Sequence, residues 1–171
     1  MLCERLPVHI DPLRFSETGR LLKGRIPLAG MTRLADYLLQ TEGEVEVELE
    51  FGVDDVRTSF LHGQLSTSLK LICQRCLGEM DHRINNDFLI AFVAEDKSQE
   101  TIPEQYEPFL LDGELVHLQD LIEDELILAL PIVPKHSQPC VELNPDINAK
   151  NADAETIKDQ SPFAILSSLK K

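Results

Sequence analysis

The chain has 171 residues, 43% of them hydrophobic and only 5% aromatic, so it can bury a core of mainly aliphatic side chains in one domain. Its formal net charge is −14, from 30 acidic and 16 basic residues. This disfavours binding to bare RNA, because such binding relies on Lys and Arg at phosphates, and it favours basic partners. No stretch approaches the roughly 20 apolar residues of a membrane span, and no signal peptide is evident. We therefore expect a soluble, cytoplasmic protein without membrane association, whose thiols stay reduced.

The first half of the sequence has mostly the patterns of β-strands. Residues 21–28 form a short mixed run, and residues 31–40 have helical spacing with Thr32 as a suitable N-cap. Residues 44–53 alternate between apolar side chains and the acids Glu44, Glu46, Glu48 and Glu50, which predicts a strand with one solvated face. Further strands are predicted at residues 56–61, 65–72 and 80–93, with turns at Gly63-Gln64 and at residues 73–76. The order of these elements predicts an antiparallel meander.

The second half is more acidic, since residues 95–171 carry 16 acids and 6 bases. We expect a loop over residues 95–107, a turn at Asp112-Gly113, and a helix over residues 118–130 that Pro131 and Pro134 end. Residues 141–161 are poor in apolar side chains, which is typical of a disordered linker, and residues 162–171 form a short apolar segment. The fold class is therefore α+β: an antiparallel sheet, able to curve toward a barrel, with two packed helices over residues 1–140 and a flexible C-terminal tail.

Three of the four cysteines lie in two short motifs. The first is Cys73-Gln74-Arg75-Cys76, and the second contains His136 and Cys140. The two motifs are separated by 59 residues. A Cys-x-x-Cys turn with a second ligand pair suits a closed zinc site, although the second spacing is loose. Two alternatives stay open: thiols at a hairpin tip with an unrelated tail cysteine, and a redox pair. A redox pair would be expected to open a helix, where the thiol pKa falls.

Three charged groups are candidates for contact with partners. Glu123 and Asp124 on the polar stripe of the helix are either structural or solvated surface residues or contacts for a basic protein. Catalysis is disfavoured, because consecutive acids on a helix cannot converge on one ion. The ladder at residues 44–50 is either a solvated face or a second docking face. The basic residues Arg20, Lys23 and Arg25 are the candidates for direct RNA contact, although no aromatic side chains are interleaved with them. Phe163 and Leu166 in the C-terminal segment either complete the core or bind a partner.

The motifs together resemble the bacterial YceD family of large ribosomal RNA subunit accumulation proteins. The likeness rests on residues 71–76, on residues 122–136 closing at Cys140, and on residues 161–170, with support from Leu6-Pro7, Asp11-Pro12 and Tyr106-Glu107-Pro108. It implies a role in accumulation of the 23S rRNA of the large subunit, and hence in ribosome biogenesis. It supplies no catalytic residue. We expect a non-catalytic factor that binds a basic ribosomal or assembly protein and meets 23S rRNA directly or through that protein; the alternatives are a direct rRNA-binding factor and an RNA-processing enzyme.

Overall fold

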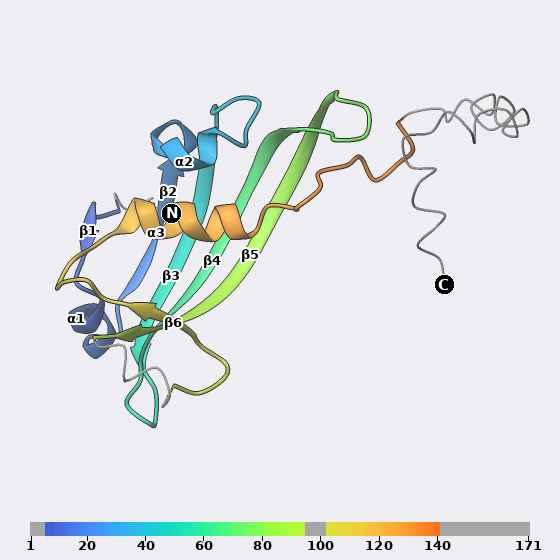
Figure 1. Cartoon of the computed structure of the whole chain (residues 1–171). Helices are drawn as coiled ribbons and strands as arrows, with labels where there is room; N and C mark the ends of the chain where they lie inside the picture. The colour runs from blue at the N-terminus through green and yellow to red at the C-terminus, as the bar shows by residue number, and fades with distance from the viewer. Residues whose placement is uncertain (1–5, 95–101, 141–171) are drawn as a thin grey trace, which may run out of the picture. The chain divides into compact units, whose positions relative to one another are not determined.

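A computed structural model describes residues 6–94 and 102–140 of the chain (Figure 1). Its main sheet has the strand order β2-β3-β4-β5-β6. Strands β2 (Leu21–Pro27), β3 (Glu44–Val53), β4 (Ser59–Ile72) and β5 (Glu79–Val93) pair antiparallel, and β6 (Glu107–Leu110) joins β5 in parallel. Strands β2 and β6 form the two edges, so the α+β prediction is confirmed and the sheet stays open rather than closing into a barrel.

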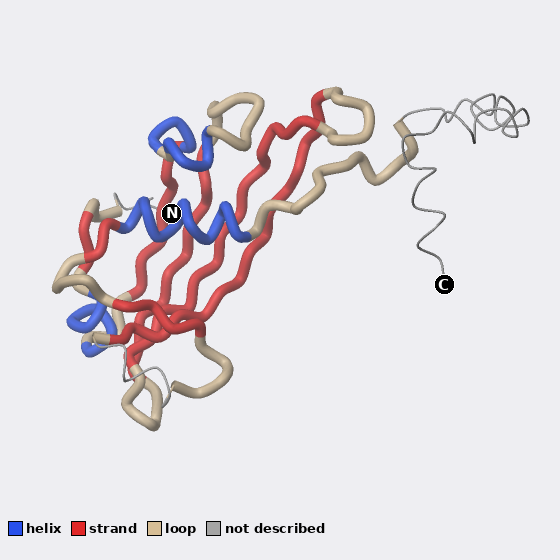
Figure 2. Tube along the Cα trace, in the orientation of Figure 1, coloured by secondary structure: helices blue, strands red, loops and turns tan. Residues whose placement is uncertain are grey.

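The helices are short except for one. They are α1 (Pro12–Glu17), the 3₁₀ turn η1 (Leu28–Gly30), α2 (Thr32–Ala35) and α3 (Leu118–Leu128). Helix α3 begins directly after β7 (Val116–His117), which pairs with β1 (His9–Ile10) in a small second sheet. Helix α3 crosses one face of the main sheet (Figure 2). Its residues Leu121, Ile122 and Leu126 are buried there, together with the inward side chains of the long strands, such as Val47, Leu49 and Leu65.

Two predicted elements differ from the structure. The predicted turn at Gly63-Gln64 lies inside the single long strand β4. Gly63 pairs with Phe88 on β5, and a Cβ atom at Gly63 would lie only 2.0 Å from the Phe88 ring. This glycine is therefore needed for close packing in a strand rather than for a turn.

The predicted helix over residues 31–40 is reduced to the four residues of α2. The chain leaves the helical path because Leu39 donates its backbone N–H to the carbonyl of Lys70 on β4, and Gln40 forms a β-bridge to the same residue. Helix α1 was not predicted, although Asp11 as N-cap and Pro12 at the first helical position are a strong start signal.

Candidate metal centre and charged surfaces

The Cys-x-x-Cys motif forms the tip of the long hairpin between β4 and β5. The backbone N–H of Cys73 donates to the carbonyl of Gly78, and that of Leu77 donates to the carbonyl of Cys73. Leu77 has a φ of 60°, a left-handed conformation that closes the turn. Cys73 is fully buried and Cys76 half-buried. The turn thus presents both sulfur atoms from one rigid segment.

The chain that leaves α3 lies against this tip. The backbone N–H of Gln74 donates to the carbonyl of Pro134 at 2.8 Å. The guanidinium of Arg75 donates to the carbonyl of His136 at 3.0 Å, and Nε2 of His136 lies 3.1 Å from the carbonyl oxygen of Glu79. Pro131 and Pro134 prevent the helix from continuing, so the segment can extend along the hairpin.

These contacts bring together the four residues that the sequence analysis grouped. Cys73, Cys76, His136 and Cys140 each offer one ligand atom, and these atoms all lie within 4.8 Å of one another. Sγ of Cys76 is 3.5 Å from Nδ1 of His136, and the three cysteines of this group form no disulfide. We refer to these four residues as the Cys3His cluster. It has four ligand atoms that could hold a metal ion, which agrees with the predicted closed site.

The environment of Cys73 favours its thiolate form. Burial alone would raise the pKa of this thiol, but hydrogen bonds from the backbone of Cys76, His136 and Arg75, together with the Cys76 side chain, lower it to about 5. A metal-binding cysteine must be deprotonated. The backbone of the two segments therefore prepares at least one ligand of the cluster for a cation.

The structure changes the interpretation of the acidic residues on α3. The prediction that Glu123 lies on the exposed polar stripe is wrong, because its exposed fraction is 2%. Its carboxylate accepts hydrogen bonds from the backbone N–H groups of Arg33 and Leu34, at 2.7 and 2.8 Å, and from the Arg33 guanidinium. It thereby caps the N-terminus of α2, the role predicted for Thr32. Asp124 is exposed but forms an ion pair with Arg33.

Glu125, two residues further along, has a different environment. Its exposed fraction is 8%, and its carboxylate accepts a hydrogen bond from the Asn86 amide at 3.5 Å. Burial, and secondarily the negative charge of Glu107, raise its pKa to about 7. Glu123 and Glu125 are thus both buried on one helix but have different hydrogen-bond partners.

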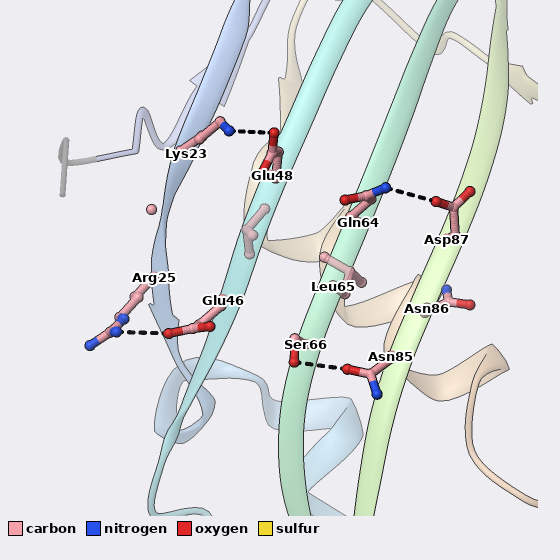
Figure 3. A pocket seen from close by; sticks show the side chains of 12 residues that line it. Lys23, Arg25, Glu46, Glu48, Gln64, Leu65, Ser66, Asn85, Asn86 and Asp87 are labelled. Carbon is pink, nitrogen blue, oxygen red and sulfur yellow. Dashed lines mark hydrogen bonds and ion pairs between the residues drawn. The ribbon is translucent and has the colours of Figure 1, made fainter. Parts of the chain in front are cut away.

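The acidic ladder on β3 lies opposite the basic residues of β2, on the sheet face that points away from α3 (Figure 3). Lys23 forms an ion pair with Glu48, and Arg25 pairs with Glu46 at 2.7 Å and with Glu44 at 3.9 Å. Arg20 lies over the ring of Phe15. The neighbouring polar residues line a trough of about 880 Å³. The candidate RNA-binding residues and the ladder therefore neutralise much of each other's charge.

A more uniform acidic surface occurs at residues 102–124, which we call the acidic segment. Between residues 102 and 134 the sequence has eight acids and no Lys or Arg. Six of these acids have exposed side chains. Asp120 lies 2.9 Å from Nδ1 of His117 and Asp124 pairs with Arg33; the other four are Glu104, Glu107, Asp112 and Glu114. The absence of bases is visible in the sequence, although the predicted docking face was placed at Glu123 and Asp124 instead. Phe163 and Leu166 lie outside the described residues, so their role as partner contacts stays a prediction.

Comparisons with known proteins agree with the motifs. The family model described as "Large ribosomal RNA subunit accumulation protein YceD" matches residues 61–170. A relative of that name from Haemophilus influenzae is 31% identical over 170 residues, which cover 98% of this chain and 97% of the relative. No solved structure matches the chain, and none of the helices in the described residues is long and apolar enough to cross a membrane. On these two sequence matches, the chain belongs to the YceD family.

Proposed function

We propose that this protein is a non-catalytic ribosome biogenesis factor in the cytoplasm that supports accumulation of the 23S rRNA of the large subunit. The main support is the near full-length match to a relative whose name states accumulation of the large ribosomal RNA subunit. The chemistry of the described residues agrees with this role. The Cys3His cluster offers four protein ligands, as in structural metal sites, and leaves no ligand position for substrate.

The proposed mode of action is binding of a basic ribosomal or assembly protein through the acidic segment. The observation that supports this mode is a set of four exposed acids, Glu104, Glu107, Asp112 and Glu114, within a stretch that has no Lys or Arg. Exposed acids of one sign produce a potential that accelerates association with a basic protein and that weakens as salt rises. Contact with 23S rRNA would then occur through that protein.

A matched pair of charge reversals tests this mode. The double variant Glu107→Lys and Glu114→Lys changes two exposed acids of the acidic segment, and Glu46→Lys with Glu48→Lys makes the same charge change on the paired ladder. Binding of purified basic large-subunit proteins at low salt is measured by titration after thermal melts confirm folding. We expect about a tenfold loss of affinity for the first variant and less than about threefold for the second, since a tenfold change needs only about 1.4 kcal/mol. Equal losses would contradict the assignment to the acidic segment.

The same preparations separate the alternative functions. Tight, salt-sensitive binding to protein-free 23S rRNA that is lost in the triple variant Arg20→Gln, Lys23→Gln and Arg25→Gln would support the direct RNA-binding factor instead. Cleavage of an rRNA precursor by purified protein would support the processing enzyme. Under the proposed function we expect neither result.

We also propose Zn²⁺ as the resident ion of the Cys3His cluster, because thiolate and imidazole ligands in a closed set of four are typical of structural zinc. Metal analysis of protein purified without chelator should give about one zinc per chain. Cys76→Ser should remove the metal and lower the melting temperature. Cys3→Ser, which changes a cysteine outside the cluster, should leave both unchanged; native protein without metal would exclude this cofactor.

A further inference from the structure

The two ring nitrogens of His136 have different contacts. The carbonyl of Glu79, 3.1 Å from Nε2, can only accept a hydrogen bond, so Nε2 carries the proton. In a neutral imidazole the other nitrogen, Nδ1, is then unprotonated and can act as an acceptor or a metal ligand. Nδ1 faces Sγ of Cys76 at 3.5 Å. The nitrogen that can bind a metal is therefore the one that faces the sulfur ligands.

The 3.5 Å separation itself points to a shared ion. With Zn–S near 2.3 Å and Zn–N near 2.0–2.1 Å, tetrahedral geometry places the sulfur and nitrogen ligands about 3.5–3.6 Å apart. The observed distance between Cys76 Sγ and His136 Nδ1 matches this value. A disulfide between two of these cysteines would need a sulfur separation near 2.05 Å, and Cys73, Cys76 and Cys140 form no disulfide.

We propose, on the basis of the zinc assignment above, that the ion is a clamp between the hairpin tip and the exit of α3. In this clamp His136 binds through Nδ1, and its Nε2–H donates to the Glu79 carbonyl. Cys73 and Cys76 come from the hairpin, whereas His136 comes from the segment that follows α3. Metal binding thereby ties together two parts of the chain that are about 60 residues apart in sequence.

Arg75 is the positioning residue of this clamp. It lies between the two cysteines of the motif in sequence, and its guanidinium donates to the carbonyl of His136 at 3.0 Å, which fixes the backbone of the ligand. Three thiolates and one neutral imidazole around Zn²⁺ leave one net negative charge, which a nearby guanidinium stabilises. Groups that orient a metal ligand in this way typically change metal affinity by about 10–100-fold when they are removed.

The coordination mode can be measured on the full-length protein loaded with zinc. A long-range ¹H–¹⁵N correlation spectrum of the histidine rings distinguishes zinc at Nδ1 from zinc at Nε2. We expect His136 to show a protonated Nε2 and a metal-bound Nδ1. Zinc bound through Nε2 would overturn the clamp geometry without affecting the assignment of zinc, whereas protein without zinc would end the cofactor proposal.

The role of Arg75 is tested by competition with a chromogenic chelator. Arg75→Gln should bind zinc about 10–100-fold more weakly, and Arg75→Lys should recover part of that loss because it restores a donor and a positive charge. Arg83→Gln removes an equal charge from β5 at a position that pairs with Ser68, outside the 73–78 turn, and should leave the affinity unchanged. Equal affinities of Arg75→Gln and the unaltered protein would overturn the positioning role.

The clamp also predicts local ordering. Amide hydrogen exchange of Gln74, whose N–H donates to Pro134, should accelerate at least tenfold when zinc is removed by chelation. The amide of Leu65, in the centre of the sheet, should show little change. If zinc binds but Gln74 exchanges at the same rate with and without it, the ion does not hold the α3 exit in place.

Discussion

The ladder on β3 and the acidic segment are both rich in carboxylates, but their surroundings differ. Each of Glu44, Glu46 and Glu48 lies within ion-pair distance of a base on β2. Glu104, Glu107, Asp112 and Glu114 belong to a stretch in which the nearest bases in sequence are Lys97 and Lys135. Exposed ion pairs add at most about 1 kcal/mol each to stability. The effect of β2 is therefore mainly to cancel the potential of the ladder, whereas the acidic segment keeps its potential for a partner.

The same contrast between acids with and without a cationic partner occurs inside the protein, on α3. Glu123 is held by Arg33 and by the first N–H groups of α2, whereas Glu125 has only the distant amide of Asn86 and acidic neighbours. Burial of a charge stabilises a protein only where partners compensate for the lost water. The carboxylate of Glu123 should therefore contribute to stability, whereas the ionised form of Glu125 should reduce it.

The largest expected effect on stability comes from removing Glu123, the buried acid that has hydrogen-bond and ion-pair partners. Glu123→Ala should lower the free energy of unfolding by about 3 kcal/mol, because it leaves the α2 N-terminus uncapped and removes the ion pair with Arg33. Urea denaturation measures this change. Asp124→Ala, whose ion pair with the same arginine is exposed, should cost less than about 1 kcal/mol. Equal costs would mean that burial is not the reason for the difference.

The destabilising effect of Glu125, the buried acid without a cationic partner, should depend on pH. The folded pKa of Glu125 is raised from its ordinary 4.5 to about 7, so the folded state binds more protons than the unfolded state between these values. Stability from this group therefore falls as pH rises from about 4.5 to 7 and stays low above that. Glu125→Gln should stabilise the protein by about 2 kcal/mol at pH 8 and by almost nothing at pH 4. Urea denaturation across this range checks the difference, and a gain independent of pH would contradict it.

The smallest effect on stability should come from removing the β2 cations that pair with the ladder. Lys23→Gln with Arg25→Gln leaves Glu46 and Glu48 without their cations and should cost less than about 1 kcal/mol in total. The new negative potential should raise the on-rate for a basic protein by a few-fold at low salt. Stopped-flow binding at two salt concentrations measures this rate. An unchanged on-rate would show that the sheet face is out of reach of the partner.

Much of the sheet and the longest helix could be predicted from local patterns. Alternation over residues 44–53 and the apolar run near residues 88–93 correspond to β3 and β5, because a strand with one buried face imposes period two on its own sequence. The spacing on α3 and the prolines after it set that helix in the same local way. The Cys-x-x-Cys turn could also be predicted from local sequence, since its two sulfur ligands come from four consecutive residues.

Only the tertiary structure decided which groups meet across the chain. The cap of α2 comes from Glu123, about 90 residues away, and the space above Gly63 is filled by Phe88. The pairing of Lys23 with Glu48 depends on strand register, and the approach of His136 to Cys76 depends on where α3 ends. The sequence determined which residues could carry charge or bind a metal. Whether each charge is matched, and whether the ligands converge, depends on distances of a few ångströms that form only when separate elements pack together.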